Sequence, residues 1–216
     1  MTEEIEVHGV VLSSAPVRDY DKRLSLLTNE LGKITVWASG AQKPGSALMA
    51  PTRNFVFGTF RLGKGRSGYN LRSVKVHQYF EEIALDLVNA CYGSYILELA
   101  DYMAQENLEA DEMVNLVYVS LKAVLSPNIP DELVRRVYEL RMLYLNGEYT
   151  ELPPMEASPA CSFAWKFVLD TPVLRLYTFT LKPEVLKEFS ANVDILLREA
   201  LPHSFRSLEI LKTLGS

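Results

Sequence analysis

Residues 33–48, KITVWASGAQKPGSAL, join a strand pattern to a flexible basic loop. Ile34, Val36 and Ala38 alternate with Lys, Thr, Trp and Ser, which is the period-two pattern of a half-buried strand. Beyond the strand, small residues and a Pro-Gly pair surround Lys43, and this composition predicts a loop. A mobile basic loop at the end of a strand calls for a negatively charged partner.

Four further strand patterns surround this stretch within the first 80 residues. Residues 5–14, 23–30, 54–63 and 67–77 are short, alternate with period two and are rich in β-branched and aromatic residues. Gly58 lies inside the third of them and predicts a bulge or a bend. Five short strands suit a small closed barrel, because closure removes the exposed edges of a sheet.

From residue 81 the hydrophobic period changes to that of helices. Ile83, Leu87, Cys91 and Tyr95 follow one stripe, which is typical of an amphipathic helix over residues 80–106. Five more helices are expected, over residues 111–126, 130–147, 159–169, 182–201 and 204–214. The predicted organisation is therefore a β-barrel domain over residues 1–80, followed by an all-α domain over residues 81–216.

Charge is divided unevenly between these two parts. Residues 1–80 hold eleven Lys or Arg against six Asp or Glu, a balance of +5, although the whole chain carries −5. The remainder has a balance of −10. Such asymmetry suggests separate domains with separate partners, and a basic face attracts polyanions such as nucleic acid.

Several classes of protein are disfavoured by what the sequence lacks. It has no phosphate-binding P-loop, no G-x-S-x-G elbow and no H-E-x-x-H motif, so an enzyme is not expected. No apolar run is long enough to span a membrane, and the acidic N-terminus lacks the features of a secretory signal. We therefore expect a cytoplasmic location. The two distant cysteines, Cys91 and Cys161, are expected to be small buried hydrophobes.

Three segments of the chain resemble the bacterial recombination mediator RecO. They are VRDYDKRLSLLTNELGKITVWASGAQKPGSAL (17–48), GTFRLGKGRSGYNLRSVKV (58–76) and FRSLEILKTL (205–214). The resemblance implies an N-terminal OB-fold that binds single-stranded and duplex DNA, followed by a helical domain. It also implies that the protein anneals complementary strands and, with RecR, helps to load RecA onto DNA covered by single-stranded DNA-binding protein (SSB). No cofactor is implied, and the location would be nucleoid-associated.

A DNA-binding barrel needs a basic groove and rings on which bases can stack. Four aromatic residues are candidate platforms. Two of them, Phe55 and Phe57, are phenylalanines, which are more often buried in a protein core. Trp37 and Tyr69 stand beside basic loops and are the stronger candidates. The predicted DNA-binding residues are Lys33, Trp37, Lys43, Arg53, Arg61, Lys64, Arg66, Tyr69, Arg72 and Lys75.

The helical part raises two further expectations from the resemblance. RecO proteins contact the acidic, hydrophobic tail of SSB, and the candidate residues here are Arg135, Arg136, Arg141 and Arg175. Ion pairs with neighbouring acids are the simpler explanation of these arginines. Many RecO proteins also carry a four-cysteine zinc module, but LNGEYTELPPMEASPAC (145–161) leads almost directly into the next helix. We therefore expect no bound metal.

Two other functions are compatible with the same patterns. The barrel and the acidic helical part could dock other proteins, as an adaptor with weak affinity for DNA. An OB-fold could also bind RNA rather than DNA. Strand annealing distinguishes the first alternative from a RecO-like mediator, and competition between RNA and DNA distinguishes the second.

Overall fold

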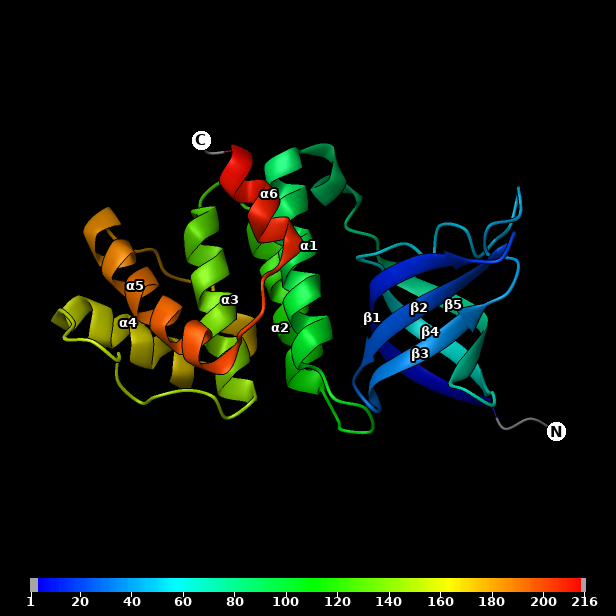
Figure 1. Ribbon diagram of the computed structural model, residues 1–216, viewed down its shortest axis with the longest axis horizontal. Coiled ribbons are helices and arrows are strands. Elements are labelled where there is room, and N and C mark those ends of the chain that lie inside the picture. The colour runs from blue at the N-terminus through cyan, green and yellow to red at the C-terminus, as the bar shows by residue number, and fades with distance from the viewer. Residues whose placement is uncertain (1–3, 215–216) are drawn as a thin grey trace. The chain divides into compact units, whose positions relative to one another are not determined.

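Five strands form a closed barrel in the first part of the chain (Figure 1). The structure is a computed structural model and describes residues 4–214. Neighbouring strands follow the order β1-β2-β3-β5-β4, and β1 also pairs with β4 to close the barrel. All pairs are antiparallel except β3 with β5. The strands are β1 Glu4–Val17, β2 Asp21–Thr28, β3 Gly32–Ala38, β4 Phe57–Lys64 and β5 Tyr69–Gln78. This is the five-stranded OB-fold topology that the sequence predicts.

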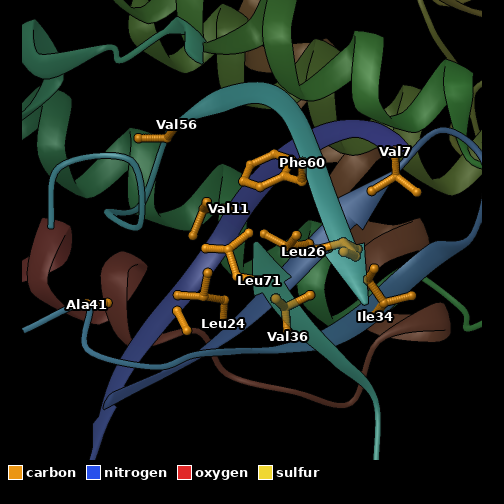
Figure 2. Packing of buried hydrophobic residues seen from close by; sticks show 12 residues of the cluster. Val7, Val11, Leu24, Leu26, Ile34, Val36, Ala41, Val56, Phe60 and Leu71 are labelled. Carbon is orange, nitrogen blue, oxygen red and sulfur yellow. The ribbon is translucent and has the colours of Figure 1, made fainter. Parts of the chain in front are cut away.

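The interior of the barrel is filled by one face of each strand (Figure 2). On β3, Ile34, Val36 and Ala38 are buried, while Lys33, Thr35 and Trp37 point outward and are half-buried. Packing of these alternate residues against the other strands removes apolar surface from water and stabilises the barrel. The cluster also contains Val7, Val11, Leu24, Leu26, Ala41, Val56, Phe60, Leu62 and Leu71.

Strand β4 differs from its prediction at its beginning. The sequence pattern extends the strand back to residue 54, but Phe55 has a left-handed backbone (φ 72°) and β4 begins only at Phe57. The bulge expected at Gly58 is confirmed, because the β4–β5 register shifts between Phe57 and Gly58. The extra residue at this shift, His77, belongs to β5. Phe57 keeps the outward orientation of Arg61 and is buried because its ring packs on Phe80.

Six α-helices and two short 3₁₀ helices follow the barrel within residues 81–214 (Figure 1). The predicted first helix is interrupted: Phe80 has φ 53°, and the Asp86 side chain accepts the Asn89 backbone N–H and starts a new helix. Leu87 is 58% exposed, so its assignment to the buried stripe is wrong. None of the described helices could cross a bilayer. The elements are η1 Glu81–Leu85, α1 Leu87–Met103, α2 Asp111–Val124, α3 Asp131–Leu145, α4 Pro159–Asp170, η2 Val173–Arg175, α5 Pro183–Ala200 and α6 Arg206–Leu214.

The chain separates into two compact units. The barrel unit contains the five strands together with Leu97–Val114. The helical unit contains Glu82–Ile96 and the chain from Asn115 onward. Helix α1 therefore contributes its first half to the helical unit and its second half to the barrel unit.

The segment Leu97–Val114 is bound to the barrel by main-chain hydrogen bonds near the β2–β3 turn. The Lys33 N–H donates to the Gln105 carbonyl at 2.9 Å, and the Asn107 N–H donates to the Leu31 carbonyl at 2.9 Å. A side chain at Gly32 would lie 2.2 Å from the Gln105 carbonyl oxygen, and its φ of +62° also favours glycine. Only glycine therefore permits this close approach.

Candidate nucleic-acid interface

Trp37 lies on the outer face of β3, one residue before the strand ends. It lies directly opposite Arg23 in the β2–β3 ladder, so both side chains share the outer face. The indole N–H donates to the Ser67 carbonyl in the β4–β5 hairpin at 3.0 Å. One edge of the ring is thus anchored, while the side chain stays half-buried. An anchored, partly exposed indole beside a cation is suited to stacking on a nucleobase.

The loop after β3 is fastened to the loop between β1 and β2. The Gly40 N–H donates to the Asp21 carboxylate at 2.8 Å, and the Gln42 N–H donates to the Tyr20 carbonyl at 2.9 Å. Lys43 is exposed, and its ammonium lies 5.9 Å from the centre of the Tyr20 ring. The basic loop therefore shares one surface with an exposed aromatic side chain.

The β4–β5 hairpin forms a second basic projection. Its turn is closed by the Gly65 N–H, which donates to the Gly68 carbonyl at 2.9 Å. Lys64 and Arg66 are both exposed, and neither makes an ion pair with the described residues. Because the Trp37 indole is bonded to this hairpin, these two cations lie near the ring.

Two predicted DNA-binding arginines lie beside carboxylates of β1. Arg61 Nε is 3.6 Å from the Glu6 carboxylate and 4.0 Å from that of Glu4, and Arg72 Nε is 3.9 Å from Glu4. All four side chains are about half exposed. These arginines form a separate group on the outer surface of β1, β4 and β5.

The remaining predicted cations are dispersed. The Lys33 ammonium donates a short hydrogen bond to the Asp101 carbonyl, so it is already bound to the segment Leu97–Val114. Arg53 lies 3.9 Å from Glu81, with both side chains exposed. Lys75 is exposed on β5. Lys64 and Arg66 thus lie on the hairpin that is bonded to the Trp37 indole, and Lys43 lies in the loop that follows β3. The other predicted cations lie elsewhere.

Among the other candidate rings, Phe57 is less accessible than Trp37, whereas Tyr69 and Phe55 are half-buried like Trp37. Phe57 is buried and packs edge-to-face on Phe80, with ring centres 5.6 Å apart. Tyr69 is half-buried against the barrel core, and Phe55 is half-buried where the chain turns into β4. The barrel contains an additional exposed ring that the sequence analysis did not select, Tyr20.

Two further cations belong to this surface and were missed by the sequence analysis. Arg23 is the direct cross-strand partner of Trp37, and Arg18 is exposed in the β1–β2 loop with φ 65°. The sequence could have predicted the position of Arg23. If β2 and β3 are aligned across the short turn that joins them, Arg23 lies opposite Trp37. The surface of Arg18, Tyr20, Arg23, Trp37, Lys43, Lys64 and Arg66 is called the Trp37 surface below.

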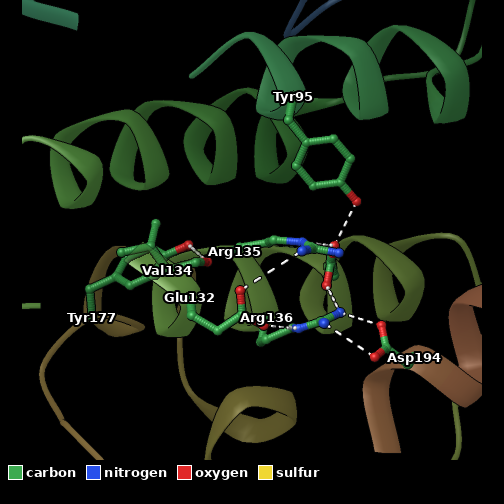
Figure 3. Close-up of polar contacts among 8 residues, drawn as sticks. Tyr95, Glu132, Val134, Arg135, Arg136, Tyr177 and Asp194 are labelled. Atoms are coloured by element: carbon green, nitrogen blue, oxygen red, sulfur yellow. Dashed lines mark hydrogen bonds and ion pairs between the residues drawn. The ribbon is translucent and has the colours of Figure 1, made fainter. Parts of the chain in front are cut away.

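In the helical unit, Arg136 is buried among three carboxylates (Figure 3). Its guanidinium donates to Glu132 at 2.7 Å, to Glu139 at 2.9 Å and to Asp194 at 2.6 Å. Burial alone would lower the pKa of Arg136, but the carboxylates of Glu139, Glu132 and Asp194 outweigh burial and raise it. Glu139 is completely buried and also accepts the Tyr95 hydroxyl at 2.7 Å. This network joins α1, α3 and α5.

Two of the other three predicted peptide-binding arginines also have internal partners. Arg135 donates to Glu139 at 2.7 Å. Arg141 is buried, donates to the Val168 carbonyl at 3.2 Å and to the Leu169 carbonyl, and its guanidinium lies 4.5 Å from the centre of the Tyr144 ring. The bonds of Arg141 connect α3 to the end of α4.

Arg175 differs from the α3 arginines because it is exposed at the edge of a pocket. The pocket has a volume of about 540 Å³ and is lined by α4 and by the segment that follows it. Phe163, which is 73% exposed, and Phe167 supply an apolar wall, while Lys166 adds a second cation. The lining also includes the Asp170 carboxylate, so the recess carries two cations against one acid. This balance is suited to an acidic peptide that carries a hydrophobic side chain.

The described residues contain no group of three or more Cys, His, Asp or Glu side chains placed to hold a metal ion. Both cysteines are buried and free. Burial, followed by the nearby Glu188 carboxylate, raises the pKa of the Cys161 thiol to about 11. Cys161 is therefore a neutral thiol at physiological pH and a poor metal ligand.

Comparisons with known proteins agree along most of the chain. Residues 1–80 match the family model described as recombination protein O N terminal, and residues 84–153 match the one described as recombination protein O C terminal. A DNA repair protein RecO of Clostridium perfringens is 26% identical over 96% of this chain and 97% of its own length. Those of Alkaliphilus metalliredigens and Clostridium acetobutylicum are 29% and 34% identical, over 76% and 64% of this chain and 67% and 56% of their own lengths.

Proposed function

The chain belongs to the RecO family, and we propose that it is a non-catalytic mediator of DNA repair and recombination that binds single-stranded and duplex DNA and anneals complementary strands. The observation that carries this proposal is the Trp37 surface. There, a ring anchored by the Ser67 carbonyl lies opposite Arg23 of β2, and further cations lie at the end of β4 and in three loops of the barrel.

Annealing follows from the kind of contacts this surface offers. Lysine and arginine on loops bind phosphates without reading sequence, and they leave the hydrogen-bonding edges of the bases free. Neutralised phosphates on two strands repel each other less, so complementary bases can pair while both strands are held. Duplex DNA presents the same phosphates and is bound through the same cations. The site of action is then the chromosome, in the cytoplasm.

We extend the proposal to the partners that the family resemblance implies. The protein acts with RecR to help RecA load onto DNA covered by SSB, and it binds the SSB tail through the helical unit. Among the four arginines expected to bind the tail, Arg175 is the exposed one beside an apolar pocket, whereas Arg136 and Arg141 are buried. Arg175→Glu is expected to weaken binding of a tail peptide, while Arg206→Glu, at another exposed position, leaves it unchanged.

The DNA-binding proposal is tested by replacing Lys43, Lys64 and Arg66 together with alanine. Affinity for single strands is expected to fall for all sequences alike, and the rate of strand annealing is expected to fall with it. The slope of log affinity against log salt should also flatten by roughly one unit per lost phosphate contact.

The matched control replaces three exposed cations of the helical unit, Lys182, Lys187 and Arg206, with alanine. It removes the same charge and is expected to leave annealing unchanged. Equal DNA affinity and annealing in the two triple variants, with equal thermal stability, would contradict a DNA-facing barrel and favour the adaptor function. Tighter binding of RNA than of DNA by the unmodified protein would favour an RNA-binding factor.

A further inference from the structure

Part of the outer face of β2 and β3, next to the Trp37 surface, is occupied by the chain itself. Ser25 points outward from β2, and its hydroxyl donates to the Asp101 carboxylate at 2.6 Å. Further along, Gly32 pairs with Glu106, and the Ala110 N–H donates to the Asn29 carbonyl at 2.9 Å. OB-folds bind nucleic acid on this face. A DNA strand bound here must therefore end or change direction where it meets the segment 101–110.

A small pocket lies at the border between the covered and the open parts of this face. Its volume is about 230 Å³. One wall is formed by β3, the second by the β4–β5 hairpin, and the third by the turn between α1 and α2. The lining residues are Lys33, Ile34, Thr35, Ser67, Gly68, Tyr69, Glu106 and Asn107.

The hairpin wall of this pocket is held in place from both sides. Trp37 binds the Ser67 carbonyl from the outer surface. On the other side Gly68 has φ +107°, and a side chain there would lie 2.5 Å from the Thr35 carbonyl oxygen. At this point the hairpin can approach β3 closely only because residue 68 has no side chain. The shape of the pocket is therefore fixed by the packing of the hairpin on β3.

Apart from Lys33, the polar side chains of the pocket have no partner among the residues that the structure describes. Among residues 4–214, the Thr35 hydroxyl, the Glu106 carboxylate and the Asn107 amide make no hydrogen bond or ion pair. The Lys33 ammonium is occupied by the Asp101 carbonyl. With an unpaired carboxylate and an occupied ammonium, the pocket disfavours a phosphate and favours a neutral group that donates hydrogen bonds.

A nucleobase has this chemistry, and guanine has it most completely. The pairing edge of guanine presents two adjacent N–H donors, from N1 and N2, which the two oxygens of one carboxylate can accept together. Its O6 atom accepts a hydrogen bond, which an asparagine amide can donate. Adenine, cytosine and thymine each lack such a pair of adjacent donors.

We propose that this pocket binds one unstacked guanine of the single strand, next to the base that stacks on Trp37, with Glu106 accepting from N1 and N2. The proposal rests on the proposed DNA-binding function. Thr35 and Trp37 lie two residues apart on the same face of β3, a separation of about 6.6 Å. A stretched single strand spans this distance between neighbouring bases, so both sites can be filled at once.

The test uses the full chain and three nine-nucleotide thymidine strands whose central base is thymine, guanine or hypoxanthine. Hypoxanthine keeps N1–H and O6 of guanine but lacks the N2 amino group. The strand with guanine is expected to bind at least about fivefold more tightly than the all-thymine strand, and hypoxanthine should lose most of that gain. The readout is the ratio of affinities, because removing any carboxylate strengthens binding to all DNA.

The decisive variant is Glu106→Gln, and Glu109→Gln is its matched control, since both residues are exposed in the same turn but only Glu106 lines the pocket. We expect the guanine-to-thymine ratio to fall to near one in Glu106→Gln and to stay unchanged in Glu109→Gln. A ratio near one in the unmodified protein, or an unaltered ratio in Glu106→Gln, overturns the pocket. Failure of all strands to bind overturns the proposed function itself.

Discussion

Arginine is used in opposite ways in the two units. Arg66 of the barrel is exposed on a hairpin and makes no ion pair with the described residues. Arg136 of α3 is 5% exposed and contacts three carboxylates from two helices. The same side chain is therefore available to a ligand in one unit, as we propose for Arg66, and is a structural link in the other. A count of charges along the sequence cannot distinguish these uses, whereas the partners of each guanidinium can.

The ion pairs that arginines of the barrel form with carboxylates of β1 contribute little to stability. Arg61 and Arg72 lie 3.6–4.0 Å from Glu4 and Glu6, with side chains about half exposed. Exposed pairs contribute about 0–1 kcal/mol, so a phosphate can replace the carboxylate at little cost. Buried pairs behave differently, because removing one partner leaves an uncompensated charge in the interior. The comparison thus predicts unequal effects of similar substitutions.

The largest effect is expected from Arg136→Met. This change removes one of the two guanidinium groups bonded to Glu139, which is completely buried, and the one bonded to Asp194. The free energy of unfolding of the helical unit should fall by about 3–5 kcal/mol. Urea unfolding followed by circular dichroism measures this loss.

Arg175→Met is the control for that experiment. Arg175 is exposed, and an exposed substitution away from special features usually changes stability by less than about 0.5 kcal/mol. Equal stabilities of the two variants would show that the α3 network is not a structural link and would reopen Arg136 as a ligand-binding residue.

Alkaline pH should destabilise the helical unit through Cys161. The folded-state pKa of its thiol is about 11, above the ordinary value of 9.0, so the unfolded chain loses this proton first. The stabilising contribution is complete below pH 9 and is lost as the pH rises to 11. It amounts to about 2–3 kcal/mol, from two pH units at 1.36 kcal/mol each.

The contribution of Cys161 is isolated by comparing the protein with Cys161→Ala between pH 8 and pH 11. The variant is expected to show a shallower fall in unfolding free energy over this range. Identical slopes in the two proteins would mean that the thiol ionises as easily in the folded state as in the unfolded chain.

A smaller effect is expected from Trp37→Ala, and it should fall on binding rather than on stability. Trp37 is half-buried and lies on the outer face of β3, away from the barrel interior. Loss of a stacking platform should weaken binding of single-stranded DNA by about 1–3 kcal/mol. Fluorescence anisotropy with a labelled thymidine strand measures the change. A loss of about 3–5 kcal/mol in stability instead would identify Trp37 as a core residue.

The strands of the barrel could be predicted from the sequence because successive residues of a strand point alternately into the barrel and outward. Alternation along β3 separates Ile34 and Val36 from Trp37 without any knowledge of the fold, and Gly58 marks the bulge. Phe55 escaped prediction because its left-handed backbone is fixed by the surrounding loop rather than by its own preference. The β-strand expected from residue 54 consequently begins three residues late, at Phe57.

The candidate site was less predictable, because exposure of a cation is a tertiary property. Arg136 meets Asp194, 58 positions away, and Lys33 meets the Asp101 carbonyl, 68 positions away. No local pattern distinguishes these residues from Lys43 or Arg66. The occupied part of the β2–β3 face was also invisible, since it depends on where Leu97–Val114 packs.

The smallest effect is expected from removing metal ions. In the helical unit the network of Arg136 and the bonds of Arg141 already connect α3 with α4 and α5, so a zinc module is not needed to hold these helices together. Structural zinc sites need about four Cys or His ligands, and no metal-binding group is found among the described residues. Dialysis against a chelator should therefore change neither the unfolding free energy nor strand annealing, and elemental analysis should find far less than one zinc per chain. A stoichiometric metal, with loss of stability on its removal, would show that the helical unit depends on an ion as well as on its buried arginines.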